Sequence, residues 1–490
     1  MRSIRVCEGD YEALQPRLGE RSNLGWAYAS ENQMTRHSAS PIQRLAAYAQ
    51  RLQYADLPAE VVQQAKKVTL DTLGVLLAAA SLGYRATAAI RELVRGLGGT
   101  PEATVVGSGV RVPAVHAALA NGTLADNIEL DDSHPLSGAH IAAVIIPTAL
   151  AVAEREGASG REFLTAVVLG YDVDARVVLG LNPASLYRRG FHPSAVGGCF
   201  GATATAGKLL GLTEGELIHA LGLAGSQASG LMAWETDPTQ MPKSLQMGIA
   251  ARNGITAALL AQRGFSGPPD ILAGRYNALA AFSDAPRPEA LADELGTRFE
   301  IALTGLKKYA CCRFLHATLD AFLDVVRSHD LGPADIESVT VRVPEAGAPI
   351  IDNNELLSHN AQYIIALAAR DRQIMPHHIY GDLRSDPQVA ALSQRVRVVG
   401  DPELSRVFPG RFSEPAVVDV LTRSGVRLTA RSDYASGDPE KPLTSQEVED
   451  KFMALAVTMV TEARAREIAR LVGGLEALAD MRVLGEMLGG

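Results

Sequence analysis

Runs in which apolar residues recur every three or four positions dominate the first half of the chain. Two examples are AEVVQQAKKVTLDTLGVLLAAAS (59–81) and VPAVHAALANGTLADNIEL (112–130). This spacing places apolar side chains on one face of an α-helix. Ser40 followed by Pro41 predicts the start of the first helix. Capping-box pairs mark three later helix starts: Ser159 with Glu162, Thr213 with Glu216, and Thr444 with Glu447.

The pattern changes after the Gly- and Pro-rich segment AQRGFSGPPDILAG (261–274). Short runs with alternating apolar residues follow and predict strands at 337–344, 394–401, 415–425 and 426–433. Helical patterns lie between them, and helical spacing returns from Thr444 to the end, after the polar run SGDPEKP (436–442). We read that polar run as a linker.

These patterns predict a mainly α fold with two domains, which suits the length of 490 residues. Residues 40–268 and 441–490 are expected to form a large helical domain built from both chain ends. Residues 269–440 are expected to form a smaller α+β lid domain. Residues 1–39 lack helical periodicity and are expected to be an N-terminal extension.

Composition and charge narrow the classes of function. Only 21% of residues are charged, the net charge is −9 and no long basic run occurs, which argues against nucleic acid and favours a small-molecule substrate. The N-terminus has no apolar signal region, so we expect a cytoplasmic protein. The longest apolar stretch (141–153) is too short to span a membrane. The four cysteines include no Cys-x-x-Cys pair, which argues against disulfide frameworks and structural zinc.

The segment DDSHPLSGAH (131–140) concentrates ionisable side chains between two apolar helical runs. Carboxylates and imidazoles at this density can bind a metal, exchange protons or hold an anionic substrate. The alternative is a solvated loop whose Asp and Ser residues cap the next helix.

Three other segments carry candidate chemistry. His192 precedes a Gly- and Ala-rich helix whose N-terminus favours an anion, although a lone histidine is often structural, and no dinucleotide motif is present. Lys243 lies before an apolar helix, where it could act as a base of lowered pKa, pair with a substrate carboxylate, or simply be solvated. Lys307, Lys308, Arg313 and His316 form a cationic cluster that suits an anionic ligand or a surface helix start.

The segment GSGVRV (107–112) is expected to turn between two short strands.

In order along the chain, these segments resemble the MmgE/PrpD family, which includes 2-methylcitrate dehydratase, cis-aconitate decarboxylase and iminodisuccinate epimerase. The pieces that carry the resemblance are LDTLGVLLAA, NGTLADNIELDDSH, GFHPSAVGGCFGATATAGKLLGL, MPKSLQMGIAARNGITAALLAQRGFSGP, LKKYACCRFLHATLDA and NAQYIIALAA. The resemblance implies a helical domain from both chain ends with an α+β lid, usually as a homodimer. It also implies chemistry without metal or other cofactor.

The resemblance assigns roles residue by residue. Glu129 stands where relatives usually have Asp, ahead of the matching Asp131 and Asp132, and Ser133 replaces a common Thr. His140, His192, Lys243 and Lys307 match pocket histidines and lysines, and Tyr363 matches a pocket tyrosine more loosely. The spacing from His134 to His140 is more similar to that of the epimerase-type members.

A physical account joins these residues. Removing a proton next to a carboxylate builds negative charge there, which Lys243, Lys307 and His140 would stabilise. His192 is the expected base, while Asp131 or Asp132 would orient a histidine. Glu129, Ser133, His134, Lys307 and Tyr363 are expected to bind substrate. The predicted function is a cofactor-independent dehydratase for a small di- or tricarboxylic acid. The alternatives are an epimerase or isomerase, a decarboxylase, and an inactive carboxylate-binding homodimer.

Overall fold

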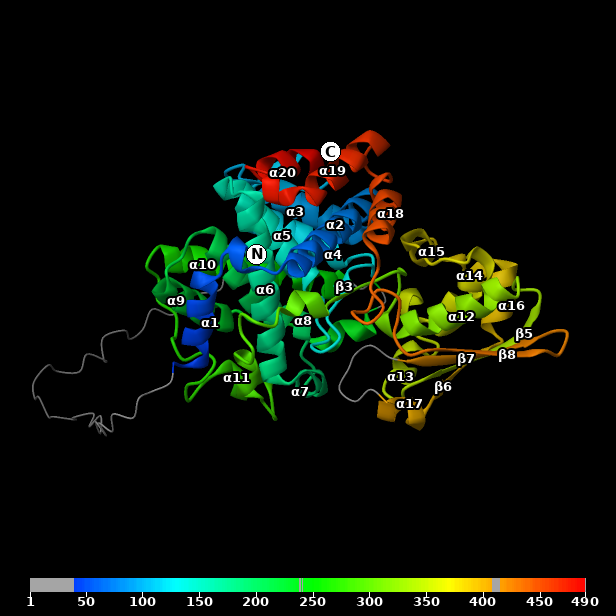
Figure 1. The fold of residues 1–490 in the computed structure, drawn as a ribbon. Helices are drawn as coiled ribbons and strands as arrows, with labels where there is room; N and C mark the ends of the chain where they lie inside the picture. Colours follow the sequence, from blue (N-terminus) through cyan, green and yellow to red (C-terminus); the bar gives the residue numbers. More distant parts are fainter. Residues whose placement is uncertain (1–38, 238, 240, 408–414, 490) are drawn as a thin grey trace, which may run out of the picture. The chain divides into compact units, whose positions relative to one another are not determined.

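The computed structural model describes residues 39–237, 239, 241–407 and 415–489 (Figure 1). The expected extension 1–39 lies outside the described residues, apart from its last residue. The described chain is mainly helical, with short sheets, so the predicted fold class is confirmed.

The helices before the sheet begin where the sequence places their caps. Ser40, Ser159 and Thr213 each accept a hydrogen bond from the third helical residue, as capping boxes require. The helices are α1 (Pro41–Arg51), α2 (Ala59–Ser81), α3 (Arg85–Leu97), α4 (Ala114–Asp126), α5 (Ala142–Glu156), α6 (Gly160–Leu181), α7 (Pro183–Arg188), α8 (Pro193–Leu209), α9 (Glu214–Gly225), α10 (Met241–Gln262) and α11 (Ala278–Phe282).

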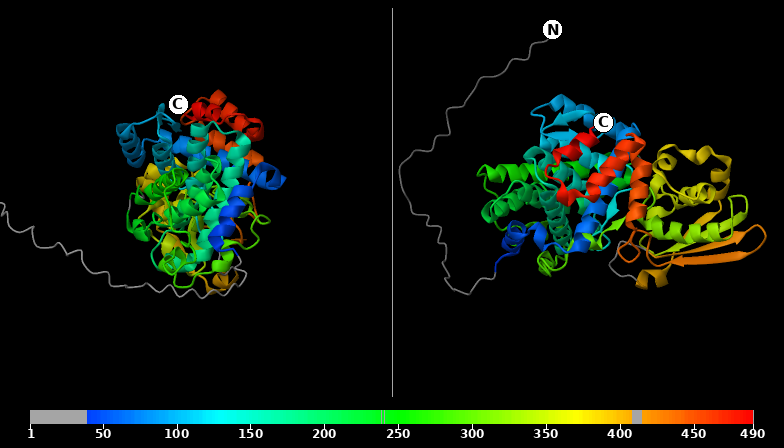
Figure 2. Two further views of the ribbon diagram at one scale, coloured as in Figure 1. Left: turned by 90° about the vertical axis from the view of Figure 1, so that its left-hand side faces the viewer. Right: turned by 45° about the horizontal axis from the view of Figure 1, so that its top comes forward.

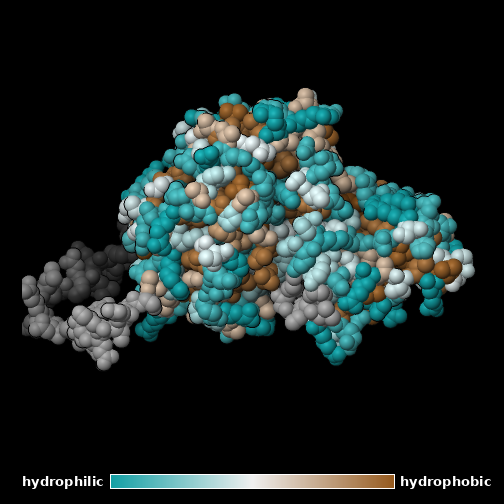
Figure 3. Space-filling view, viewed as in Figure 1, coloured by the Kyte–Doolittle hydropathy of each residue, from teal (hydrophilic) through white to brown (hydrophobic). Residues whose placement is uncertain are grey.

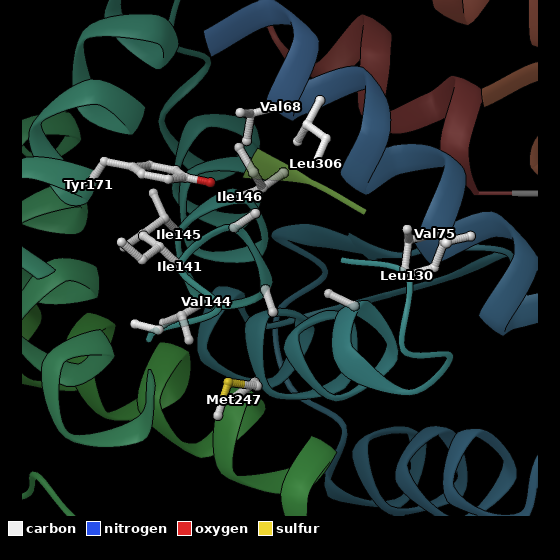
Figure 4. Packing of buried hydrophobic residues seen from close by; sticks show 14 of the residues in the cluster. Val68, Val75, Leu130, Ile141, Val144, Ile145, Ile146, Tyr171, Met247 and Leu306 are labelled. Atoms are coloured by element: carbon white, nitrogen blue, oxygen red, sulfur yellow. The ribbon is translucent and has the colours of Figure 1, made fainter. Parts of the chain in front are cut away.

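Helix α5 lies in the core of this helical part. Ile141, Val144, Ile145 and Ile146 are fully buried and pack near Tyr171 of α6 (Figure 4). The helix contacts α4, α6, α8 and α10, which explains why its sequence is apolar on all sides. It is too short to span a membrane and is a buried helix, as expected.

The largest sheet in the described residues has four strands and lies in the second half of the chain. Its strands are β5 (Ile336–Val343), β6 (Val396–Gly400), β7 (Ala416–Thr422) and β8 (Arg427–Ser432), in the order β6-β5-β7-β8. β5 pairs with β6 in parallel, whereas the other pairs are antiparallel. From Val339 to Val343, buried positions in β5 alternate with partly buried ones, which matches the period of two seen in the sequence. The nearby helices are α12 (His316–Ser328), α13 (Ala348–Ile351), α14 (Ala361–Asp371), α15 (Pro376–Tyr380), α16 (Pro387–Ser393) and α17 (Pro402–Val407).

The last helices return to the first ones. They are α18 (Ser445–Ala456), α19 (Glu462–Gly473) and α20 (Arg482–Leu488). α18 lies beside α2 (Figures 1 and 2), where Lys451 Nζ lies 2.6 Å from Asp71 Oδ1. The run 436–442 is not the simple polar linker that we expected. Asp438 is fully buried there and bonds the guanidinium of Arg313.

Two short antiparallel pairs complete the strands. β1 (Ala103–Val105) pairs with β2 (Val110–Val112), so the expected turn at 107–112 between short strands is confirmed. β3 (Asp132–Ser133) pairs with β4 (Gly305–Leu306). The face shown in Figure 3 is mainly hydrophilic, with apolar residues in separate small areas. No single described helix is long and apolar enough to cross a membrane; only α2 and α3 taken together pass that test, and they meet at a bend of 92°.

Candidate functional site

The short β3–β4 pair joins two segments that are far apart in the sequence. Asp132 pairs with Leu306 and Ser133 with Gly305. This pairing brings Lys307 next to the ionisable segment 131–140, where its Nζ lies 3.0 Å from Asp131 Oδ1.

A close helix crossing brings a second lysine to the same place. α4 and α10 meet at Gly122 and Gly248, and a Cβ added to Gly122 would lie 2.8 Å from the Gly248 Cα. Only glycine allows the two backbones to approach this closely. Asp126 lies one turn beyond Gly122 on α4, and its Oδ1 accepts a hydrogen bond of 2.9 Å from Lys243 Nζ at the start of α10.

Glu129 connects the two lysines. Its Oε1 lies 2.5 Å from Lys243 Nζ and its Oε2 lies 3.0 Å from Lys307 Nζ. All three side chains are buried. Burial alone would raise the pKa of Glu129, but the two ammonium groups hold it well below its usual range. The carboxylate of Glu129 is therefore ionised and occupies the space between two cations.

The lysines remain charged in this cluster. Burial alone would lower the pKa of Lys243, but Asp126 and Glu129 raise it well above its usual value. Burial alone would also lower the pKa of Lys307, but Asp131 and Glu129 raise it above its usual value. The interpretation of Lys243 as a base of lowered pKa is therefore wrong. In the structure Lys243 pairs with the protein carboxylates of Asp126 and Glu129, and its pairing with a substrate carboxylate stays a prediction.

His140 faces carboxylate and carbonyl oxygens. Its Nδ1 lies 2.8 Å from the Asp132 carbonyl oxygen and 2.8 Å from Asp131 Oδ2. A carbonyl only accepts hydrogen bonds, so Nδ1 carries a hydrogen. Burial would lower the pKa of His140, but the Asp131 carboxylate raises it. The imidazole is therefore biased towards its protonated form.

His192 is biased towards its neutral form. Gln246 donates from Nε2 to the Leu231 carbonyl, which turns its Oε1 towards His192 Nδ1 at 2.9 Å. Nδ1 therefore donates, and Nε2 keeps its lone pair. Burial and the nearby Lys243 ammonium lower the pKa of His192 to about 3. His192 is a neutral imidazole at neutral pH.

These groups line a cavity of about 660 Å³. Glu129, Ser133, His140, His192, Lys243 and Lys307 are among its lining residues, so six of the ten predicted site residues share one cavity. Its other lining residues are Leu136, Gly138, Leu179, Asn182, Pro183, Ala184, Tyr187, Met232, Trp234, Glu235, Arg287, Cys312, Arg313, Phe314, Ala346, Ile350, Asn354, Leu356 and His359.

Asp131 and Asp132 lie behind the cavity wall. Asp131 contacts Lys307 and His140, as the expected orienting role requires. Asp132 Oδ2 accepts a 2.7 Å hydrogen bond from Tyr171, and its Oδ1 accepts one from the Ala142 amide. Burial and the neighbouring Asp131 raise the pKa of Asp132 to about 7.

His134 and Tyr363 do not line the cavity. His134 is fully buried, with Nδ1 bonded to Ser137 and Nε2 lying 3.4 Å from Glu300 Oε2. The Tyr363 hydroxyl donates to the His378 carbonyl and accepts from the Leu383 amide. The structure thus places both side chains in the packing around the site, and their expected contact with substrate has no support in the cavity lining.

Three residues of this site received no role from the sequence reasoning. Asp126 is one helical turn before Glu129, a spacing that could have indicated a shared face. His359 lines the cavity four residues before Tyr363. Trp234 lines it as well, with its ring centroid 5.4 Å from that of His192 and 5.8 Å from Lys243 Nζ. The buried indole Nε1 of Trp234 has no hydrogen-bond partner among the described residues.

Asp126, Asp131 and His140 are the one group in the described part of the chain with the closeness that a metal site needs. Their candidate ligand atoms lie within 4.8 Å of one another. Both carboxylates already contact ammonium groups, Asp126 through Lys243 and Asp131 through Lys307. A divalent ion would have to compete with these lysines, so the residues present fit such an ion poorly.

Comparisons with known proteins agree with this arrangement. The model of the MmgE/PrpD N-terminal domain matches residues 43–291, and that of the C-terminal domain matches residues 309–477. The chain belongs to the MmgE/PrpD family. The two matched ranges leave out Lys307, although it bonds Glu129 from the N-terminal range.

Three relatives illustrate the similarity. The cis-aconitate decarboxylase of Aspergillus terreus is 27% identical over 472 residues, which cover 90% of this chain and 94% of the relative. The cis-aconitate decarboxylase of Homo sapiens is 28% identical, covering 90% of this chain and 92% of the relative. The 2-methylcitrate dehydratase of Cupriavidus necator is 25% identical, covering 74% of this chain and 79% of the relative. Both kinds of relative are lyases, so the family likeness supports an enzyme.

Proposed function

We propose that this protein is a cofactor-independent lyase that moves a proton at a carbon next to a carboxylate of a small polycarboxylic acid. The observation that carries the proposal is the pair of histidines in one cavity with opposite biases. His192 is neutral with a free Nε2 lone pair, whereas Asp131 favours the protonated form of His140. Such a pair supplies a base and an acid at the same pH.

The lysines provide the second part of the mechanism. Proton removal next to a carboxylate moves negative charge onto its oxygens. Lys243 and Lys307 line the same cavity as fixed cations, so a substrate carboxylate beside them would be stabilised more in the transition state than in the ground state. Trp234 Nε1 adds a buried donor without a partner among the described residues.

Loss of water is the reaction that we propose first. His192 Nε2 would take the proton from the carbon, and His140 would donate a proton to the departing hydroxyl group. The C–O bond would break, the protonated hydroxyl group would leave as water, and the electrons of the broken C–H bond would form the double bond of the olefin, so atoms and charges balance.

Loss of carbon dioxide is the second candidate, because the cis-aconitate decarboxylases match a larger share of the chain than the dehydratase does. In that case the carboxyl carbon would leave as carbon dioxide. The electron pair it leaves behind would be protonated at carbon by His140.

One incubation separates these reactions. The purified protein is mixed with citrate, 2-methylcitrate or cis-aconitate in deuterated water, and the products are followed by NMR. An olefin with loss of hydroxyl indicates dehydration, carbon dioxide release indicates decarboxylation, and deuterium uptake with an unchanged skeleton indicates epimerisation. Tight binding without any turnover or exchange would contradict the proposal and favour a binding protein.

Matched variants test the site. His192→Gln should lower turnover by about 10²–10⁴-fold, as loss of a general base does. His329→Gln is the control, since His329 is exposed on the C-terminal side of α12. Equal rates in both variants would show that His192 is not the base.

A further inference from the structure

The lining of the cavity includes a cluster of charged residues, several other polar residues and many apolar ones. The salt bridges of Glu129 with Lys243 and Lys307 gather the charged side chains together. Trp234 borders this group, 5.8 Å from Lys243 Nζ. Much of the remaining lining is apolar, including Leu179, Met232, Phe314, Ile350 and Leu356.

The cavity is larger than the space that a small acid held at the lysines would fill. Cavities of roughly 300–1,000 Å³ hold ligands the size of a drug molecule, and this one has about 660 Å³. An acid with only a short carbon skeleton, held by its carboxylates at the lysines, would leave the apolar wall facing water. A substituent of several carbons would cover that wall and gain the free energy of burying apolar surface.

The two lysines of the charged cluster are already paired with carboxylates. Glu129 already contacts both lysines, Asp126 contacts Lys243 and Asp131 contacts Lys307. The guanidinium of Arg313, which also lines the cavity, contacts the buried carboxylate of Asp438. This balance suits a ligand whose recognition depends partly on carbon and only partly on carboxylates.

We propose that the preferred substrate is a polycarboxylic acid that carries an alkyl substituent of several carbons. Its carboxylates lie at Lys243 and Lys307, and its alkyl group lies along the wall that includes Trp234, Phe314 and Ile350. This inference rests on the proposed function and specifies its substrate class.

A homologous series tests the inference directly. Citrate and its 2-methyl, 2-butyl and 2-hexyl derivatives are titrated by calorimetry, and their turnover is followed by NMR. The Kd should fall by about fourfold for each methylene that becomes buried, and kcat/KM should rise with it. A Kd that does not change along the series would overturn the inference.

Variants on the wall locate the effect. Ala346 is an exposed lining residue, so Ala346→Phe adds bulk to the wall and should remove most of the advantage of the hexyl derivative. Ile350→Ser, which shortens and polarises the wall, should reduce the same advantage and serves if the first variant folds poorly. Ala89→Phe on the exposed side of α3 is the control and should leave the whole series unchanged. A full chain-length dependence in both wall variants would contradict the inference.

The two proposals fail in different ways. Turnover or deuterium exchange with citrate, together with a flat chain-length dependence, would overturn the alkyl substrate and leave the lyase standing. A steep chain-length dependence in binding, without turnover or exchange of any acid in the series, would support the alkyl ligand and contradict the lyase. Absence of binding across the series would overturn the inference.

Discussion

The buried carboxyl group of Asp132 should make the protein less stable as the pH rises from acidic values towards neutrality. Burial and the neighbouring Asp131 raise its pKa to about 7, whereas the unfolded value is about 3.9. The folded protein therefore holds this proton more strongly than the unfolded chain. The stabilising contribution is fully present below about pH 3.9 and is lost as the pH rises towards 7.

Replacing Asp132 with Asn removes this titration with little change of shape. The amide oxygen can still accept from the Ala142 N–H, now 2.9 Å from Oδ1. The Tyr171 hydroxyl, 2.7 Å from Oδ2, can accept from the new amide group and no longer needs to donate. At about 1.36 kcal/mol per pKa unit, the wild-type protein should lose about 3 kcal/mol relative to Asp132→Asn between pH 5 and pH 8.

The assay is denaturant unfolding of both proteins at several pH values between 5 and 8, with the difference in unfolding free energy plotted against pH. Taking the difference cancels the titration of all other groups that the substitution leaves unchanged. Asp324→Asn on the exposed face of α12 is the control and should run parallel to the wild type. Parallel curves for Asp132→Asn and the wild type would refute the assignment of a raised pKa to this group.

Three further predictions concern the cluster and its scaffold. Lys243→Met should lower kcat by about 10²–10³-fold, as loss of one transition-state donor does. The control is Lys308→Met, which should keep the wild-type rate, because the half-exposed Lys308 side chain lies 3.9 Å from Glu447. Similar losses in both variants would contradict a specific role of Lys243. Gly122→Ala should destabilise the protein by about 1–3 kcal/mol in urea unfolding, because the new Cβ would lie 2.8 Å from the Gly248 Cα. Unchanged stability would show that α4 and α10 separate easily. Dialysis against a strong chelator should leave activity intact, and a loss that a divalent ion reverses would point to a metal at Asp126, Asp131 and His140.

Local patterns in the sequence predicted much of the fold. The capping boxes at Ser159, Thr213 and Thr444 mark real helix starts, because each cap depends only on residues three positions apart. The alternation in β5 likewise reflects which of its faces is buried. Six of the ten expected site residues share one cavity, since family resemblance indicates residue types at positions that the fold brings together.

Contacts between distant segments could not be predicted in the same way. No local pattern indicates that Asp132 pairs with Leu306, or that Glu129 contacts both Lys243 and Lys307. The polar run around Asp438 resembled a linker because its buried partner, Arg313, lies far away in the sequence. For the same reason the motif around Tyr363 suggested the tyrosine, whereas its neighbour His359 is the residue that lines the cavity.

The low pKa of His192 agrees with its proposed role as a base once the bound state is considered. In the free protein, burial and Lys243 keep this imidazole neutral, so it enters the reaction with its lone pair available. The charges near it are close to balance, because Glu129 in the cavity and Asp131 behind its wall offset the two lysines. A bound carboxylate therefore adds negative charge that its surroundings do not fully compensate, and this raises the affinity of His192 for a proton. The substrate thus strengthens the base that acts on it, which links recognition of the acid to removal of its proton.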